Sequence, residues 1–182
     1  MKKLAIDSYY YSDTNCYSVG VVFNYWNSKK PDYILESTVS EFAPYIPGQF
    51  YKRELPGILS IIHQVNLNEF DTIILDGFTN LIDSSLNPLP GLGEKLDAEL
   101  EITNRRGLSI IGVAKSLFGK SDTISLPLYR GQAKTPLWIS VSSGSDIDLV
   151  TAKNYIKSMY GSSKLPDILK FLDKYTKRFL SI

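Results

Sequence analysis

Cysteine and histidine are almost absent from this chain of 182 residues, in which Cys16 and His63 are the only representatives. A single cysteine cannot form a disulfide within the chain, and it fits a protein of a reducing compartment. His63 lies in an apolar stretch, residues 58–65, whose spacing predicts a helix. We therefore expect His63 to be a packed or partly exposed helical side chain and not a metal ligand.

Long hydrophobic runs and a strong net charge are also missing. No run approaches the length that crosses a membrane, and only Leu4-Ala5-Ile6 separates the N-terminal lysines from Asp7. We expect neither a signal peptide nor a membrane partner, but a cytoplasmic monomer. The net charge of +1 gives no overall sign of a polyanion partner. Contacts with nucleic acid would have to come from local basic clusters, which are Lys29-Lys30, Lys52-Arg53, Arg105-Arg106 and Lys174-Lys177-Arg178.

What the chain does contain is enough apolar material for one core, since 43% of its residues are hydrophobic. No repeat, low-complexity segment or linker interrupts the pattern, so we expect a single domain over residues 1–182. Three strand-like stretches joined by short turns predict an antiparallel meander, and they span residues 4–11, 16–26 and 32–41.

The rest of the chain alternates between helical and strand-like patterns. Continuous apolar runs predict two buried parallel strands, residues 71–76 and 108–114. The other predicted elements are helices at 54–65 and 92–103, a hairpin-like pair at 124–129 and 137–142, and two helices within 148–179 that are broken at 161–163. A meander followed by parallel strands, with helices on both faces of a mixed sheet, is the order of the ribonuclease H-like α/β fold.

Charged side chains stand where the predicted buried strands end. Asp7, Asp76 and Lys115 each follow directly on an apolar run. Taken alone, each has an ordinary structural explanation, because an aspartate at a strand end often forms a turn and a lysine there is commonly solvated. Neighbouring strands of one sheet would nevertheless bring Asp7 and Asp76 together, so that the two carboxylates could share one metal ion.

Residues 44–54 are the most unusual stretch of the sequence. Two prolines bracket Tyr45-Ile46, which holds the backbone extended and prevents pairing as a central strand, so we expect a stiff, poorly buried wedge. Gly48 allows a turn, and Glu54 comes just before a helix that Pro56 can start. The alternative is a proline-rich surface loop before a helix, with Glu54 favoured there by the helix dipole.

Four segments, taken in order, resemble endonuclease V: Ile6-Asp7, the Pro44 to Glu54 stretch with its PYIPG and RE motifs, Leu75-Asp76-Gly77, and Gly112-Val113-Ala114-Lys115. The resemblance covers nearly the whole chain and implies the ribonuclease H-like fold. It also implies an endonuclease that depends on Mg²⁺, with Mn²⁺ able to substitute, and that hydrolyses the phosphodiester bond one nucleotide beyond inosine on the 3′ side. The expected partner is therefore inosine-containing DNA or RNA.

The resemblance implies a role for each matching residue. Asp7, Asp76 and Glu54 would hold the metal ion, and Lys115 would meet the charge that grows on the phosphate. The other matching residues would form a wedge beside an extruded base and a small pocket that reads hypoxanthine; they are Pro44, Tyr45, Ile46 and Pro47 for the wedge, and Gly48, Phe50, Gly77 and Gly112 for the pocket. For the glycines, turn formation and close packing are the alternative explanation.

The chain also departs from the endonuclease V pattern. Its first strand opens almost at Met1, where family members carry a helical extension, so we expect a divergent, N-terminally short member. Ile82 or Asn87 stands where the family has a histidine, Ser145 stands at a second histidine, and two arginines are missing. Two other classes therefore stay open: a nucleic-acid-binding protein with weakened or lost catalysis, and a ribonuclease H-like nuclease without inosine preference.

Overall fold

The computed structural model describes residues 1–12, 15–40, 49–102 and 107–178. Several residues singled out from the sequence lie outside these ranges, and their assignments stay predictions; they are Pro44, Tyr45, Ile46, Pro47 and Gly48 of the wedge and pocket, and the Arg105-Arg106 pair. Within the described ranges, no helix has both the length and the apolar character needed to cross a membrane.

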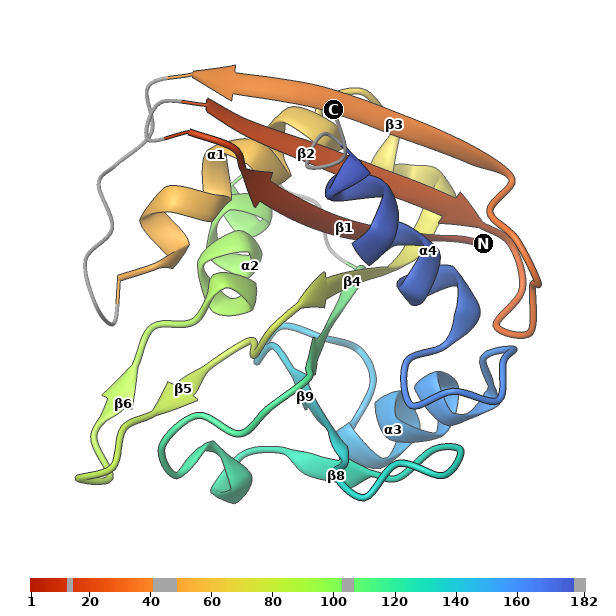
Figure 1. Ribbon diagram of the computed structural model, residues 1–182. Coiled ribbons are helices and arrows are strands. Elements are labelled where there is room, and N and C mark those ends of the chain that lie inside the picture. Colours follow the sequence, from red (N-terminus) through yellow and green to blue (C-terminus); the bar gives the residue numbers. More distant parts are fainter. Residues whose placement is uncertain (13–14, 41–48, 103–106, 179–182) are drawn as a thin grey trace.

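A seven-stranded mixed sheet forms the middle layer of the fold (Figure 1). Its strands are β1 (Lys2–Tyr10), β2 (Asn15–Phe23), β3 (Tyr33–Ser40), β4 (Phe70–Asp76), β7 (Ser109–Ala114), β8 (Leu126–Leu128) and β9 (Leu137–Val141). The first three form an antiparallel meander, after which β4 joins β1 in parallel and β7 joins β4 in parallel. Antiparallel pairing of β9 with β7 and of β8 with β9 completes the order β3-β2-β1-β4-β7-β9-β8.

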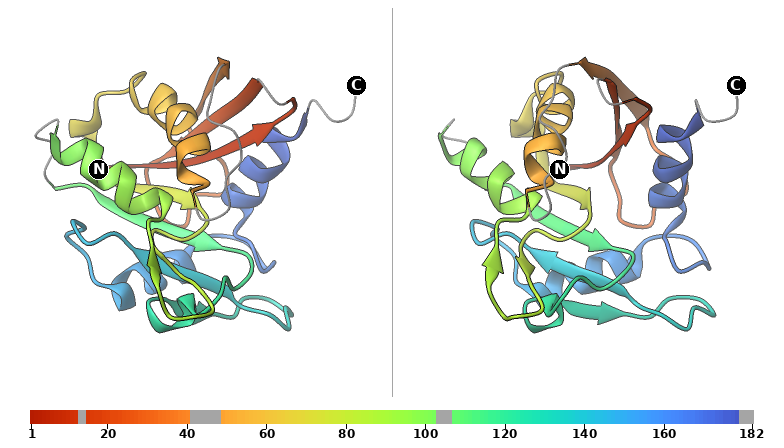
Figure 2. Two further views of the ribbon diagram at one scale, coloured as in Figure 1. Left: turned by 90° about the vertical axis from the view of Figure 1, so that its left-hand side faces the viewer. Right: turned by 60° about the vertical axis from the view of Figure 1, so that its left-hand side comes forward.

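Helices cover both faces of this sheet. They are α1 (Tyr51–Ile62), α2 (Leu92–Ile102), α3 (Leu149–Ser158) and α4 (Asp167–Thr176). Figure 2 shows α1 and α2 on one side of the sheet and α4 on the other. The predicted architecture, a meander followed by parallel strands with helices on both faces, is confirmed, as is the pairing of residues 124–129 with 137–142.

Alternation along the central strands divides the apolar side chains into two cores. Leu4 and Ile6 of β1 pack in the core that α1 and α2 cover, whereas Ala5 packs in the core that α3 and α4 cover. Successive side chains of a strand point to opposite faces. Asp7, the residue after Ile6, therefore points to the face that carries α4.

The start of α1 differs from the expectation. The helix begins at Tyr51, so the prediction that Pro56 starts it is wrong. The first turn is closed by the backbone amides of Arg53 and Glu54, which both donate to the carbonyl of Phe50 at 2.9 and 3.2 Å. Pro56 is tolerated inside the helix because it is exposed and removes only one backbone donor. Glu54 consequently lies in the first turn of the helix.

A small hairpin between β4 and α2 was not predicted. It consists of β5 (Leu81–Ile82) and β6 (Pro88–Leu89), and it projects from the body of the molecule in Figure 1. The Asp83 carboxylate orders its turn, because Oδ1 accepts hydrogen bonds from the amides of Ser85 and Asn87, both at 2.8 Å. The short helices η1 (Leu67–Glu69) and η2 (Ser121–Thr123) complete the fold, and η2 holds the hairpin through a bond from the Ile82 amide to Ser121 Oγ (2.9 Å).

Candidate active site

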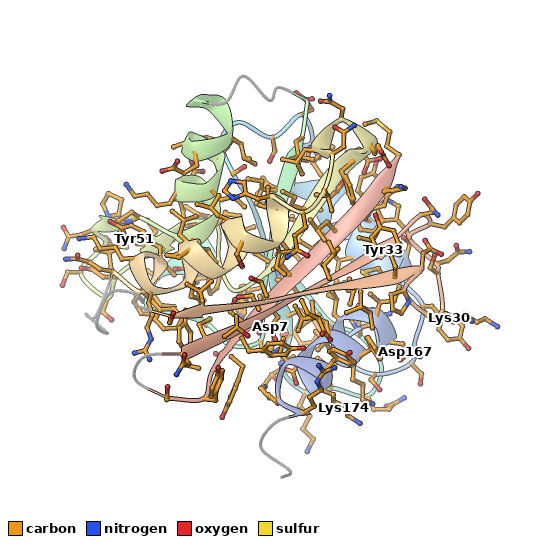
Figure 3. The ribbon with its side chains drawn as sticks, turned by 90° about the horizontal axis from the view of Figure 1, so that it is seen from above. Asp7, Lys30, Tyr33, Tyr51, Asp167 and Lys174 are labelled. Atoms are coloured by element: carbon orange, nitrogen blue, oxygen red, sulfur yellow. The ribbon has the colours of Figure 1, made fainter. Side chains whose placement is uncertain are left out.

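The ends of β1 and β4 bring two aspartates together on one face. Ile6 pairs with Leu75 in the parallel ladder, so Asp7 and Asp76 follow at equivalent positions on adjacent strands. Asp76 follows the same alternation as Asp7, because Ile74, two residues earlier, belongs to the core under α3 and α4. The predicted convergence of these two carboxylates is therefore present in the fold, and Figure 3 shows Asp7 toward the middle of the molecule.

A third carboxylate comes from α4. Carboxylate oxygens of Asp7, Asp76 and Asp173 all lie within 4.8 Å of one another. The three residues also line a cavity of about 20 Å³ between the sheet and α4, which is room for one water-sized species. Sequence reasoning missed Asp173, since a charged residue at one position of an amphipathic helix carries no signal of which strands the helix will cover.

Lys115, at the end of β7, contacts two of these acids. Its Nζ donates hydrogen bonds to Asp173 Oδ1 (2.5 Å) and Asp76 Oδ2 (2.7 Å). Desolvation alone would lower the pKa of Lys115, but the bonds to Asp173 and Asp76 raise it above its ordinary value. The ammonium group therefore stays charged and compensates part of the negative charge of the cluster.

The Asp7 carboxylate resists ionisation. Desolvation, followed by repulsion from Asp76, raises the pKa of Asp7 to about 6, although Thr176 Oγ1 donates to its Oδ2 at 2.9 Å. The ammonium groups of Lys115 and of Lys177, which donates to Asp173 Oδ1 at 2.8 Å, thus leave part of the charge on the three carboxylates uncompensated. Such a cluster gains stability from a cation or from a proton.

Glu54 approaches the cluster from the other side of the sheet edge. Its carboxylate is desolvated and is repelled by Asp7 and Asp76, which together raise the pKa of Glu54 well above its ordinary value. Among the described residues, the group of acids within 4.8 Å consists of Asp7, Asp76 and Asp173, without Glu54. Of the three predicted ligands, the structure therefore groups two, and it places the third close enough to be coupled to them electrostatically.

A cleft of about 520 Å³ opens beside the acids on the side of α1 and α2. Glu54, Asp76 and Lys115 line it together with Gly77 and four aromatic residues, which are Phe50, Tyr51, Phe78 and Phe118. Of these, Phe50 and Phe118 are exposed, at 40% and 42% of their surface. Asp76 and Lys115 line both the cleft and the small cavity, so the two spaces meet at the ends of β4 and β7.

Comparison with known proteins gives a result only at the level of structure, since neither a family model nor a curated protein matches the chain. Endonuclease V of Ciona intestinalis, in complex with an inosine-containing DNA, superposes with a TM-score of 0.74 at 20% identity over 99% of this chain and 85% of that one. Human endonuclease V superposes with a TM-score of 0.68 at 19% identity, over 99% of this chain and 84% of that one. Endonuclease V of Bacillus subtilis superposes with a TM-score of 0.70 at 17% identity, over 99% of this chain and 80% of that one.

The chain has the ribonuclease H-like fold of endonuclease V. Three of the residues matched to the endonuclease V pocket are described, and they differ in placement. Phe50 and Gly77 line the cleft, and Gly77 has a φ of +119°, a conformation that favours glycine. Gly112 lies beneath the turn after β4, where a Cβ would come within 2.5 Å of the Gly77 carbonyl oxygen. Close packing therefore explains Gly112, and the structure does not support its direct contact with a base.

The residues matched to the endonuclease V histidine positions have partners elsewhere in the fold. Asn87 is occupied in the hairpin, where its Nδ2 donates to Asp83 Oδ2 at 3.1 Å, and Ile82 lies in β5. Ser145 Oγ accepts from the Ile110 amide (2.9 Å) near the start of β7, at the opposite end from Lys115. The match of Ser145 to a histidine position of endonuclease V stays a prediction, and Asp173 is the residue that joins the cluster. His63, expected as a packed or partly exposed helical side chain, is exposed and directly follows α1, at the far end of that helix from Glu54.

The donor set fits a hard divalent cation. Mg²⁺ and Mn²⁺ prefer oxygen ligands, and one or two carboxylates with water are enough to hold Mg²⁺. Asp7, Asp76 and Asp173 offer three such groups around a water-sized cavity, and desolvation followed by repulsion from Asp76 raises the pKa of Asp7 to about 6. These three residues would hold the ion, with Glu54 reaching it directly or through water from the cleft side.

Proposed function

We propose that residues 1–182 form one domain of a monomeric, cytoplasmic endonuclease that depends on Mg²⁺ or Mn²⁺ and nicks DNA or RNA one nucleotide beyond inosine on the 3′ side. One observation carries the proposal: three carboxylates converge beside a deep cleft, at the strand ends of an endonuclease V fold. The structural neighbour from Ciona intestinalis was solved with inosine-containing DNA, which supports the same kind of substrate here.

Each residue of the cluster has a chemical task in this reaction. The bound cation would polarise the phosphate and lower the pKa of an attacking water. Asp7, Asp76 and Asp173 fix the position of that charge, since they come from three elements packed against one another. Lys115 is placed to oppose negative charge growing on the phosphate oxygens, because it already contacts the acids. Glu54 lies where it can orient a water between the cleft and the acids.

The cleft is the proposed place of the modified base. Inspection of a base requires that it leave its stack and enter a pocket, and the volume of about 520 Å³ is large enough for one. Phe50 offers an apolar surface for the base, and the bare backbone at Gly77 allows close approach. Tyr45, with Pro44, Ile46 and Pro47, is proposed to fill the gap that the base leaves.

A second candidate is a nucleic-acid-binding protein of this fold with weak or no catalysis. It is favoured by the absence of a histidine beside the acids among the described residues, since His63 is remote from them. A third candidate, a nuclease without inosine preference, is favoured by the packing role of Gly112.

Cleavage assays separate the three candidates. Purified protein is incubated with end-labelled single strands that differ only in one inosine or adenosine, in Mg²⁺, Mn²⁺ or EDTA. Divalent-dependent nicking restricted to the inosine strand, at the second phosphodiester bond on its 3′ side, is the expected result. Binding without products would support the second candidate, and equal cleavage of both strands would support the third.

A further inference from the structure

The acids and the cleft lie on opposite sides of the same sheet edge. The cavity beside Asp7, Asp76 and Asp173 is closed by α4, whereas the cleft is bordered by α1 and the β5–β6 hairpin. Asp76 and Lys115 line both spaces. A strand with its base in the cleft and its reacting phosphate at the acids must therefore cross the strand ends and leave the site over α4.

Positive charge is concentrated where that path leads. Residues 164–178 contain five basic and two acidic side chains, a net charge of +3, whereas the whole chain has a net charge of +1. The remainder of the protein is therefore slightly negative. The Arg178 side chain is held by contacts within the protein, because its guanidinium forms an ion pair with Glu36 at 3.0 Å and lies over the Tyr175 ring, 4.1 Å from the ring centroid. The exposed lysines of this stretch are Lys170 and Lys174 in α4 and Lys177 directly after it. Lys170 Nζ donates to Ser163 Oγ at 3.4 Å, a long bond at the surface.

Two of these lysines flank the acid of the cluster on the same side of the helix. Lys170 lies three residues before Asp173 and Lys177 four residues after it, so both side chains project beside its carboxylate. Both are exposed, and Lys177 Nζ donates to Asp173 Oδ1 at 2.8 Å. Their seven-residue separation spans about 10 Å along the helix, a length that covers about three nucleotides of a stacked strand.

Lys174 has a different position on the same helix. It is exposed as well, but one residue after Asp173 it points about 100° away round the helix axis. In Figure 3 it lies at the outer side of α4, whereas Asp7 lies toward the middle of the molecule. Lys174 is thus matched to the lysine pair, Lys170 and Lys177, in residue type, helix and exposure, and it differs in the direction in which it points.

We propose that Lys170 and Lys177 bind phosphates of the substrate strand on the 3′ side of the scissile bond. In this arrangement α4 supplies both an acid of the metal cluster and the surface over which the strand leaves. The polarity rests on the proposed function, because cleavage on the 3′ side of the base puts the nucleotides beyond the acids at the 3′ end. The contact is made with the backbone, so it is independent of sequence and sensitive to salt.

Binding of strands of different length tests the lysine pair. The dissociation constant of a labelled inosine-containing strand is measured in EDTA, where the proposed reaction is off, for wild type, Lys170→Ala/Lys177→Ala and Lys174→Ala. One strand extends several nucleotides beyond the scissile bond on its 3′ side, and the other ends there. The double variant should bind the long strand about 10-fold more weakly, and its slope of log K against log salt should be smaller by about 1.4, or 0.7 for each lost phosphate contact.

The short strand and the control variant make the outcome decisive. Wild type and double variant should bind the short strand equally within twofold, and Lys174→Ala should change neither affinity by more than that. The lysine pair is rejected if the double variant loses nothing, if Lys174→Ala loses as much, or if the loss persists with the short strand. If the double variant shows the length-dependent loss but the wild-type protein nicks no inosine strand in Mn²⁺, the proposed function is overturned and phosphate binding by the lysine pair stands.

Discussion

The individual acids of the cluster contribute through charge more than through packing. The side chains of Asp76 and Asp173 are 35% and 27% exposed, so a change to asparagine removes a charge without opening a cavity. We expect Asp76→Asn and Asp173→Asn to fold normally and to lose Mn²⁺ binding in isothermal calorimetry. Nicking should fall by about 100-fold or more, because a bound metal supplies several kcal/mol of transition-state stabilisation. Asp122→Asn, at an exposed aspartate outside the cluster, is the control, and wild-type Mn²⁺ affinity in Asp173→Asn would exclude that residue as a ligand.

The unusual pKa values of Asp7 and Glu54 make the fold itself sensitive to pH. Desolvation and carboxylate repulsion raise the pKa of Asp7 to about 6 and that of Glu54 well above its ordinary value. An acid whose pKa is raised by folding stabilises the fold fully below its unfolded pKa, and this stabilisation is lost as the pH rises through the folded pKa. In EDTA, the melting temperature of the wild type should therefore fall as the pH rises from about 4 through about 6, and Glu54 should extend this fall to higher pH.

The melting temperature of Glu54→Gln should fall less with rising pH than that of the wild type, because the glutamine amide cannot ionise. Its melting temperature at about pH 8 in EDTA should exceed that of the wild type, by about 2–4 °C for each kcal/mol relieved. Mn²⁺ should reduce the difference, since it compensates the same charge. Identical pH profiles of the two proteins in EDTA would contradict the proposed electrostatic coupling of Glu54 to Asp7 and Asp76.

At this scale the sequence predicts some site residues better than others. Asp7, Asp76 and Lys115 end buried strands, and the period of two along a strand fixes the face to which each points. Asp173 could not be found in this way, because the face that a helix presents depends on how the whole helix docks. The position of Ser145 relative to the acids could not be predicted for a related reason, since it depends on which end of β7 its loop returns to.

Among the elements, long apolar patterns were predictable and short ones were not. β4 and β7 contain continuous apolar runs, which are typical of buried parallel strands. The β5–β6 hairpin has two residues per strand and therefore no periodicity to detect, although it borders the cleft. The start of α1 was predicted wrongly because proline is common in the first turn of a helix. Here the residues before Pro56 already form the helix.

The connection between α3 and α4 is held by one buried side chain, that of Arg130. Its guanidinium donates to the carbonyl oxygens of Met159 (2.6 Å), Gly161 (3.1 Å) and Ser163 (3.1 Å). Arg130→Met would leave these carbonyl oxygens without their donor, and the loss at the buried Met159 carbonyl costs about 1–3 kcal/mol. We expect lower stability in urea unfolding, and also weaker Mn²⁺ binding, because the connection sets the position of α4 and Asp173.

A matched change in the same connection separates these two effects. In the wild type, Lys164 Nζ donates hydrogen bonds to the Lys115 carbonyl oxygen (2.9 Å) and to Thr135 Oγ1 (2.9 Å). Lys164→Met removes these two bonds and leaves the hydrogen bonds of the Arg130 guanidinium in place. It should lower stability less than Arg130→Met. If Arg130→Met binds Mn²⁺ as tightly as the wild type under conditions in which it is folded, the connection does not position Asp173.

Across the whole molecule, the acid cluster joins the beginning of the chain to its end. Asp7 lies in the first strand, Asp76 in a central strand and Asp173 in the last helix. In the absence of a cation, the three are linked by the Lys115 ammonium and by the bond from Thr176 to Asp7. A divalent cation bound by all three carboxylates would therefore act as a cross-link between α4 and the sheet.

Hydrogen exchange tests this cross-link without any assay of activity. Mn²⁺ at about 100 times its dissociation constant should stabilise the fold by about 2.7 kcal/mol, because it binds the native state alone. The gain in amide protection should be largest in α4, whose docking gains a second attachment, and smaller in β1 and β4, which the sheet already protects. Asp173→Asn should keep the ordinary protection of the sheet and lose the Mn²⁺-dependent protection of α4. Equal protection of all elements by Mn²⁺ in both proteins would show that the cation does not bridge the helix to the strands.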